Sequence, residues 1–191
     1  MQDPQRFNIR AWLLWTAGFL SFPIAGIAAE AVVGRIDDAG SALVGGLVAG
    51  AVIGTCQWLV ARRLLDAQTW IPATAVAMGV GLLVGAWVVG YGTSLGELAL
   101  MGFITGIPLG AAQAYLLRGR VASAWAWGVA VPLLWALGWT VTTAAGIDVE
   151  RQYAVFGALG AITFMALSGV LLDRLRAAAP SAQPGPPTAL A

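Results

Sequence analysis

The chain has 191 residues, of which 59% are hydrophobic and 10% charged, whereas soluble domains are about 45–50% apolar and about 25% charged. A soluble fold of this length cannot keep so much apolar surface from water, so the composition predicts an all-α integral membrane protein. The net charge of +1 argues against a nucleic-acid partner, which needs a basic face. The absence of His and the single Cys56 argue against metal, thiol-cluster and disulfide chemistry, and we expect no cofactor.

Charged residues divide the chain into six long uncharged runs, and each is about as long as the roughly 20 apolar residues that a membrane-spanning helix needs. The expected helices, in chain order, are 12–33, 42–61, 70–91, 97–117, 124–145 and 153–172. They form one six-helix transmembrane domain over 12–176, after a cytoplasmic N-terminal segment at 1–11. The proline-containing, uncharged tail at 177–191 has a composition typical of disorder. A cleavable signal peptide ending near Ala28–Ala31 is the rival interpretation of the first run.

The arginines predict the orientation of the chain in the membrane. Only Arg35 and Arg151 fall on one side, whereas the other side collects Arg6, Arg10, Arg62, Arg63, Arg118, Arg120, Arg174 and Arg176. Because arginine-rich loops stay in the cytoplasm, we expect both termini there, in a multi-pass protein of the bacterial inner (plasma) membrane.

A motif recurs along the chain at a fixed offset. The second expected helix carries Gly46, Gly50, Gly54, Gln57 and Arg62, and the fourth carries Gly102, Gly106, Gly110, Gln113 and Arg118, each 56 residues later. The sixth has a degenerate version, Gly157, Ala161, Met165 and Ser168 followed by Arg174. Tryptophans begin the odd helices at Trp12, Trp15, Trp70, Trp125 and Trp127, and we expect them to be interfacial anchors. The pattern predicts a bundle of three parallel helical hairpin repeats, at about 12–63, 70–120 and 124–176, around a pseudo-threefold axis.

The glycines of each motif share one helix face and predict seams of close helix packing. Gln57 and Gln113 are the candidate substrate-binding residues, because an amide in hydrocarbon must face the bundle interior, with Ser168 as the third member. The alternative is that these amides only form hydrogen bonds between helices. Glu30 is the candidate catalytic residue, since it lies within a helix one turn from its end, and Pro23 is placed to kink that helix and open a cleft beside it.

The repeated Gly-x3-Gly-x3-Gly-x2-Gln motif, followed by Trp58-Leu59-Val60-Ala61-Arg62-Arg63, resembles a group of uncharacterised bacterial multi-pass membrane proteins. The match covers the second and fourth helices well and the sixth poorly, and it implies topology without an activity. Ala114-Tyr115 departs from the group's pattern. Chain length, span count and Ala25-x3-Ala29 are also similar to substrate-binding subunits of energy-coupling-factor transporters.

Three functions remain open on the sequence. The first is a small permease or substrate-binding membrane subunit with a polar spot at Gln57 and Gln113, and the second is a non-catalytic scaffold or complex subunit. The third is an intramembrane cyclase or isomerase that uses Glu30 as proton donor on a lipophilic substrate. The expected partners are the lipid bilayer, a small or lipophilic ligand, and a second copy or another membrane protein.

Overall fold

The computed structural model describes residues 7–147 and 153–178, and every regular element within these ranges is a helix. Six helices of the described part are long and apolar enough to cross a membrane, so the chain is a multi-pass integral membrane protein. The first span, Ile9–Val33, combines α1 (Ile9–Ala17), the 3-10 turn η1 (Gly18–Leu20) and α2 (Ser21–Val33). The other five are α3 (Ala39–Ala61), α4 (Ala67–Val88), α5 (Leu95–Leu117), α6 (Ala124–Ala144) and α7 (Ala158–Ala177).

The helix boundaries differ from the expected ones mainly at the two ends of the chain. The first span begins at Ile9, inside the expected N-terminal segment, because Asn8 caps it by accepting a hydrogen bond from the Ala11 amide at 3.0 Å. The last helix begins at Ala158 and continues past Asp173 to Ala177. Charged residues therefore do not end this helix, since an α-helix tolerates them beyond the hydrocarbon layer. The rest of the expected tail, 179–191, lies outside the described residues.

Acidic and hydroxyl side chains cap the starts of the second and fourth spans, α3 and α5. Asp38 accepts a hydrogen bond from the Ser41 amide at 2.8 Å, and the Ser41 hydroxyl accepts one from the Asp38 amide at 3.1 Å. Ser94 and Glu97 form the same reciprocal capping box at the start of α5. These caps satisfy amides that have no partner inside the helix. The N-cap positions 38 and 94 are again 56 residues apart, the offset of the glycine motif.

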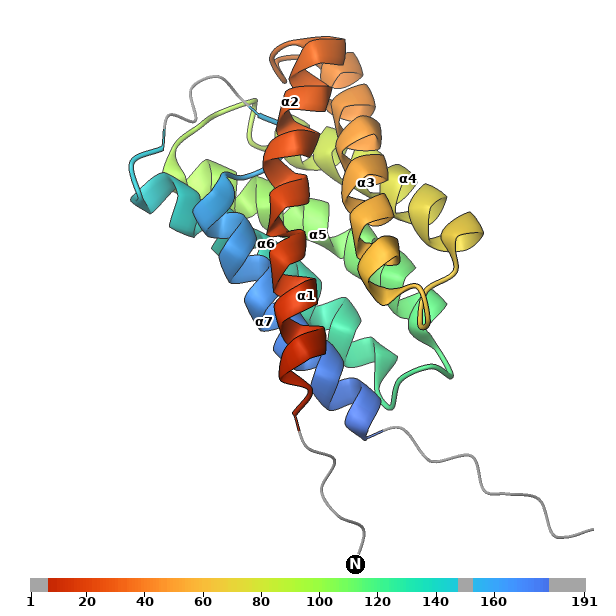
Figure 1. The fold of residues 1–191 in the computed structure, drawn as a ribbon. Coiled ribbons are helices and arrows are strands. Elements are labelled where there is room, and N and C mark those ends of the chain that lie inside the picture. Colours follow the sequence, from red (N-terminus) through yellow and green to blue (C-terminus); the bar gives the residue numbers. More distant parts are fainter. Residues whose placement is uncertain (1–6, 148–152, 179–191) are drawn as a thin grey trace, which may run out of the picture.

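The six spans form a closed ring in which each helix packs mainly on its neighbours in sequence, and α7 returns to pack on α1. Figure 1 shows α1 (red) beside α7 (blue), and α3 beside α4 at the other side of the bundle. The interior is filled by large side chains, including an aromatic core of Phe22, Trp135, Phe156 and Phe164. Their rings lie 4.8 to 6.1 Å apart, so the centre of this half of the ring is packed rather than open.

Glycines lie where neighbouring backbones come closest. A methyl group added at Gly50 would lie 2.8 Å from the Cα atom of Ala75 on α4, and one at Gly106 would lie 2.4 Å from the Cα atom of Pro132 on α6. Backbone atoms cannot withdraw as a flexible side chain can, so these positions require the absence of a Cβ atom. The two glycine seams thus join α3 to α4 and α5 to α6, which are the joints between consecutive predicted repeats.

The first span is irregular in its middle, at η1. Pro23 has no amide hydrogen, so the carbonyl of Phe19 lacks its usual partner four residues later, and the helix tightens into a 3-10 turn there. The part below the turn, α1, packs on α7, whereas the part above it, α2, packs mainly on α3. This change of neighbour separates α2 from α7 at the end of the bundle that carries Glu30.

Candidate functional sites

Gln57 and Gln113 meet inside the ring. The Nε2 amide of Gln113 donates to the Oε1 atom of Gln57 at 3.2 Å and to the hydroxyl of Thr74 at 3.3 Å. Only 2% of Gln57 and 1% of Gln113 are exposed, and α3, α4 and α5 hold the three side chains together. The glycine seams permit this, because they let the helices approach closely enough for two short amide side chains to touch.

Each amide also accepts a hydrogen bond from an indole of the next helix. Trp70 donates through Nε1 to Gln57 at 3.1 Å, and Trp127 donates to Gln113 at 3.0 Å. A third bond of this kind closes the ring, since Trp15 on α1 donates to the Ser168 hydroxyl on α7 at 3.0 Å. The Trp15 and Trp127 rings contact edge to face at 6.1 Å. We call Trp15, Gln57, Trp70, Gln113, Trp127 and Ser168 the indole–amide cluster.

The indole–amide cluster corrects the expected role of three tryptophans. Trp15, Trp70 and Trp127 are at most 3% exposed and are hydrogen-bond donors inside the bundle, not interfacial anchors. Trp125, by contrast, is 72% exposed, as an anchor should be. An indole suits either place, because it combines a large apolar ring with one donor that needs a partner when buried. The sequence carries a trace of this pairing, because a tryptophan follows each motif glutamine by 13 or 14 residues.

The indole–amide cluster is suited to joining helices. It contains no ionisable group, and neither glutamine lines any of four cavities that the described residues form. Buried amides that accept and donate to neighbouring helices stabilise a bundle in lipid, where an unpaired polar group is costly. The substrate-binding role of Gln57 and Gln113 stays a prediction.

Glu30 lines a cleft of about 310 Å³ between α2 and the α6–α7 end of the ring. Pro23 lines the same cleft, in the relation that the sequence predicts. The floor is aromatic and buried, with Phe22, Trp139 and Phe156 each at most 2% exposed. Polar groups belong to Glu30, which is exposed, and to Thr142 and Tyr153. We call this space the Glu30 cleft. It is open at the side, because α2 has little contact with α7 and none of note with α6.

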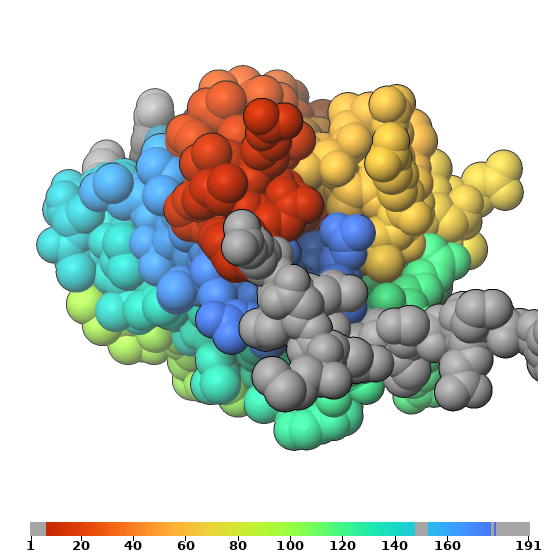
Figure 2. All heavy atoms as spheres, turned by 60° about the horizontal axis from the view of Figure 1, so that its bottom comes forward, coloured from red at the N-terminus to blue at the C-terminus, as the bar shows by residue number. Residues whose placement is uncertain are grey.

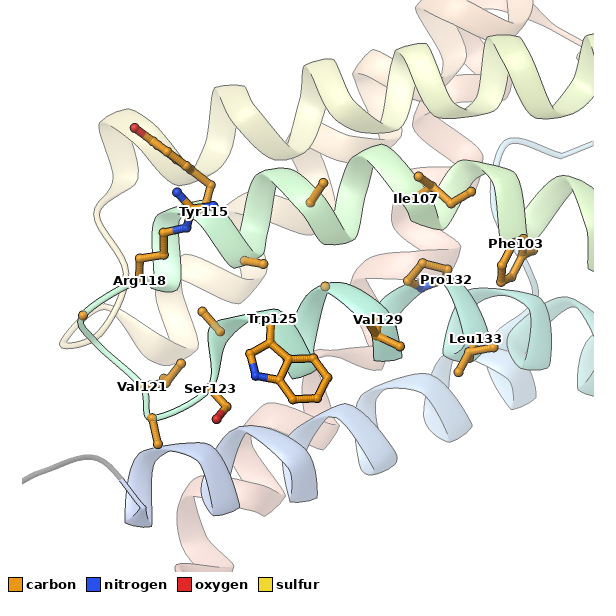
Figure 3. Close-up of a pocket in the computed structure, with 16 residues that line it drawn as sticks. Phe103, Ile107, Tyr115, Arg118, Val121, Ser123, Trp125, Val129, Pro132 and Leu133 are labelled. Carbon is orange, nitrogen blue, oxygen red and sulfur yellow. The ribbon is translucent and has the colours of Figure 1, made fainter.

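A larger groove of about 850 Å³ runs along the outer face of α5 and α6 (Figure 3). Its walls are exposed apolar side chains, among them Ile107, Val129 and Leu133, and small residues such as Ala111 and Gly128 make it deep. Arg118 and Tyr115 stand at one end of the groove, with the guanidinium carbon 4.9 Å from the centre of the Tyr115 ring. The groove faces outward from the bundle, where acyl chains of the bilayer surround a membrane protein.

Within residues 7–147 and 153–178, no three His, Cys, Asp or Glu side chains are placed to hold a metal ion. No protein-family model matches the chain, and neither a curated protein nor a solved structure is similar to it.

Proposed function

We propose that the chain is a substrate-binding membrane protein whose ligand enters the Glu30 cleft sideways from the lipid. The observation that carries the proposal is the composition of that cleft: an apolar aromatic floor with the Glu30 carboxylate at its rim, in a gap of the helix ring. Ligand sites are typically mostly apolar concavities with a few polar groups that fix orientation. In this proposal the indole–amide cluster holds the ring together and does not touch the ligand.

The lining chemistry selects the class of ligand. Phe22, Trp139 and Phe156 favour an apolar body, and the Glu30 carboxylate accepts hydrogen bonds from an ammonium or hydroxyl head group. The cleft volume of about 310 Å³ is at the lower end of typical ligand pockets, which are about 300–1,000 Å³. We therefore expect a single-chain amphiphile with a cationic or hydroxylated head, bound with its head near the end of α2.

Cavity shape supports this proposal over the two alternatives. A scaffold that only packs helices needs no cavity, whereas the Glu30 cleft reaches a buried aromatic floor. An intramembrane cyclase or isomerase needs an enclosed apolar cavity around its acid, whereas Glu30 is exposed at the edge of a cleft that is open to the side. Ligand binding requires only an accessible concave surface, and the Glu30 cleft provides one.

The test measures binding of a long-chain primary amine to the purified full-length protein, beside the alcohol and the carboxylate of equal chain length. We expect the amine to bind most tightly, and Glu30→Gln to weaken amine binding by about tenfold or more while alcohol binding changes less, because a charge-assisted hydrogen bond is lost. Ile27→Trp, at an exposed position lining the cleft, should weaken binding of all three by obstructing entry.

The matched control is Asp37→Asn, which removes an exposed carboxylate from the loop after α2, outside the cleft. It should bind the amine as the wild type does. Equal amine affinity in the wild type, Glu30→Gln and Ile27→Trp would overturn the proposal, since the probe would then be partitioning into detergent or binding elsewhere.

A further inference from the structure

A second polar cavity lies at the opposite end of the bundle from the Glu30 cleft, where the start of α1 meets the ends of α3 and α7. Its volume is about 250 Å³. The three segments face one another on the side shown in Figure 2, α1 in red, the end of α3 in gold and the end of α7 in blue. A hydrogen bond also joins the first and last spans at this end, because the backbone amide of Asn8 donates to the Asp173 carboxylate at 3.3 Å. We call this cavity the arginine pocket.

Positive charge is concentrated in the arginine pocket. Arg62 and Arg63 from the end of α3 line it together with Arg176 from the end of α7, and Asp173 is the one carboxylate among the described residues of the lining. Within the part of the chain that the structure describes, none of these three arginines forms an ion pair. Three guanidinium groups against one carboxylate repel one another, and an anion in the pocket would relieve that repulsion.

The apolar wall of the arginine pocket is fixed in place. Trp12 donates through Nε1 to the carbonyl of Ala166 at 2.9 Å, and Trp15 is held by Ser168 in the indole–amide cluster. Leu172 and Gly169 complete the wall. A low-dielectric wall beside a cluster of like charges strengthens the local field, so the pocket attracts anions more strongly than the same arginines would on an open loop.

We infer that the arginine pocket binds a phosphate group. The planar guanidinium matches the geometry of phosphate oxygens and donates two hydrogen bonds to them, and three such groups surround the pocket. The volume of about 250 Å³ is below the range of about 300–1,000 Å³ that larger ligands occupy, which favours a single phosphate over a nucleotide. The phosphate can be free in solution or belong to the head group of an anionic phospholipid, because this end of the bundle lies at the predicted cytoplasmic membrane surface.

The experiment titrates the full-length protein in neutral detergent with inorganic phosphate, and in parallel with phosphatidylglycerol in neutral-lipid nanodiscs, by tryptophan fluorescence and calorimetry. The probe variant is the double substitution Arg63→Gln and Arg176→Gln. The control variant is Arg174→Gln, which removes an exposed arginine of α7 that does not line the pocket. We expect the double variant to bind the phosphate-bearing probe about tenfold or more weakly than both the wild type and the control.

Each arm identifies one source of the phosphate. A loss confined to the inorganic phosphate titration assigns the pocket to a soluble anion, and a loss confined to phosphatidylglycerol assigns it to a lipid head group. Equal binding by the double variant and Arg174→Gln, or binding of neither probe by the wild type, would overturn the inference. The lysine variant Arg63→Lys with Arg176→Lys separates charge from folding, because it keeps the charge and should recover most of the lost affinity.

Discussion

A glutamine at membrane depth poses a choice that its sequence position does not resolve. Gln57 and Gln113 each have an amide that must be paired, and either water and a ligand or a neighbouring helix can supply the partner. In this structure Gln113 is paired to Gln57, Thr74 and Trp127 at once. One side chain therefore links α5 to α3, α4 and α6, and its loss should affect the stability of the whole ring.

We expect Gln113→Leu to lower the free energy of unfolding in mixed micelles by about 1–3 kcal/mol, because the Nε1 donor of Trp127 is left buried without its acceptor. The control is Gln68→Leu, at an exposed position in the first turn of α4, which should stay within about 0.5 kcal/mol of the wild type. A double-mutant cycle with Trp127→Phe checks the cause. If the two effects simply add, the Trp127–Gln113 hydrogen bond is not what Gln113 contributes.

At the scale of elements, the second and fourth spans, α3 and α5, hold the ring together through their glycine faces. Gly46, Gly50 and Gly54 face α4, and the corresponding glycines of α5 face α6. At the remaining joint between predicted repeats, α7 to α1, Gly169 faces the rings of Trp12 and Trp15, whereas Gly46, Gly50 and Gly106 face backbone atoms of the neighbouring helix. This difference matches the degenerate motif of the last helix. The Glu30 cleft opens between the same two spans, the first and the last, at the end of the bundle that carries Glu30.

Gly106→Ala tests the close approach of α5 and α6. The added methyl group would lie 2.4 Å from the Cα atom of Pro132, so the helices must separate, and we expect a loss of about 1–3 kcal/mol in the free energy of unfolding. Gly96→Ala on the same helix meets no atom within 4 Å and should be neutral or slightly stabilising, because alanine favours the helix. Thermal unfolding of both variants makes the comparison, and equal stability of the two would show that α5 and α6 do not need this contact.

At the scale of the molecule, the arginine-rich ends of the helices gather at one end of the bundle, together with the start of α1 and the end of α7 (Figure 1). Asp37 and the Glu30 cleft lie at the other end. The positive-inside rule predicts that the arginine-rich end faces the cytoplasm. The Glu30 cleft would then open near the outer surface and the arginine pocket near the inner one.

Cysteine labelling checks this orientation. In a Cys56→Ser background, we expect a membrane-impermeant maleimide to label Asp37→Cys in intact cells and to label Arg118→Cys only after permeabilisation. Both positions are exposed in the structure, so accessibility depends on the side of the membrane. The opposite labelling pattern would invert the topology and place the arginine pocket outside.

The sequence by itself determined the all-α class and the number of spans, because lipid requires each crossing to be a long apolar helix whose backbone is paired internally. It also located the glycines of the seams and the proline beside which the first span becomes irregular. Apart from the two motif glutamines and the glycines of the seams, it did not determine which side chains are buried, because helices that are apolar all round carry little information on the direction each face points. The tertiary structure decided that Trp15 meets Ser168, 153 residues away in the sequence, and that indoles enclose Gln57 and Gln113. It also decided where the two cavities form: the Glu30 cleft lies where α2 meets α7 and its neighbours, and the arginine pocket lies where α1 meets them. These contacts depend on how the ring closes, and closure joins residues that the chain keeps far apart.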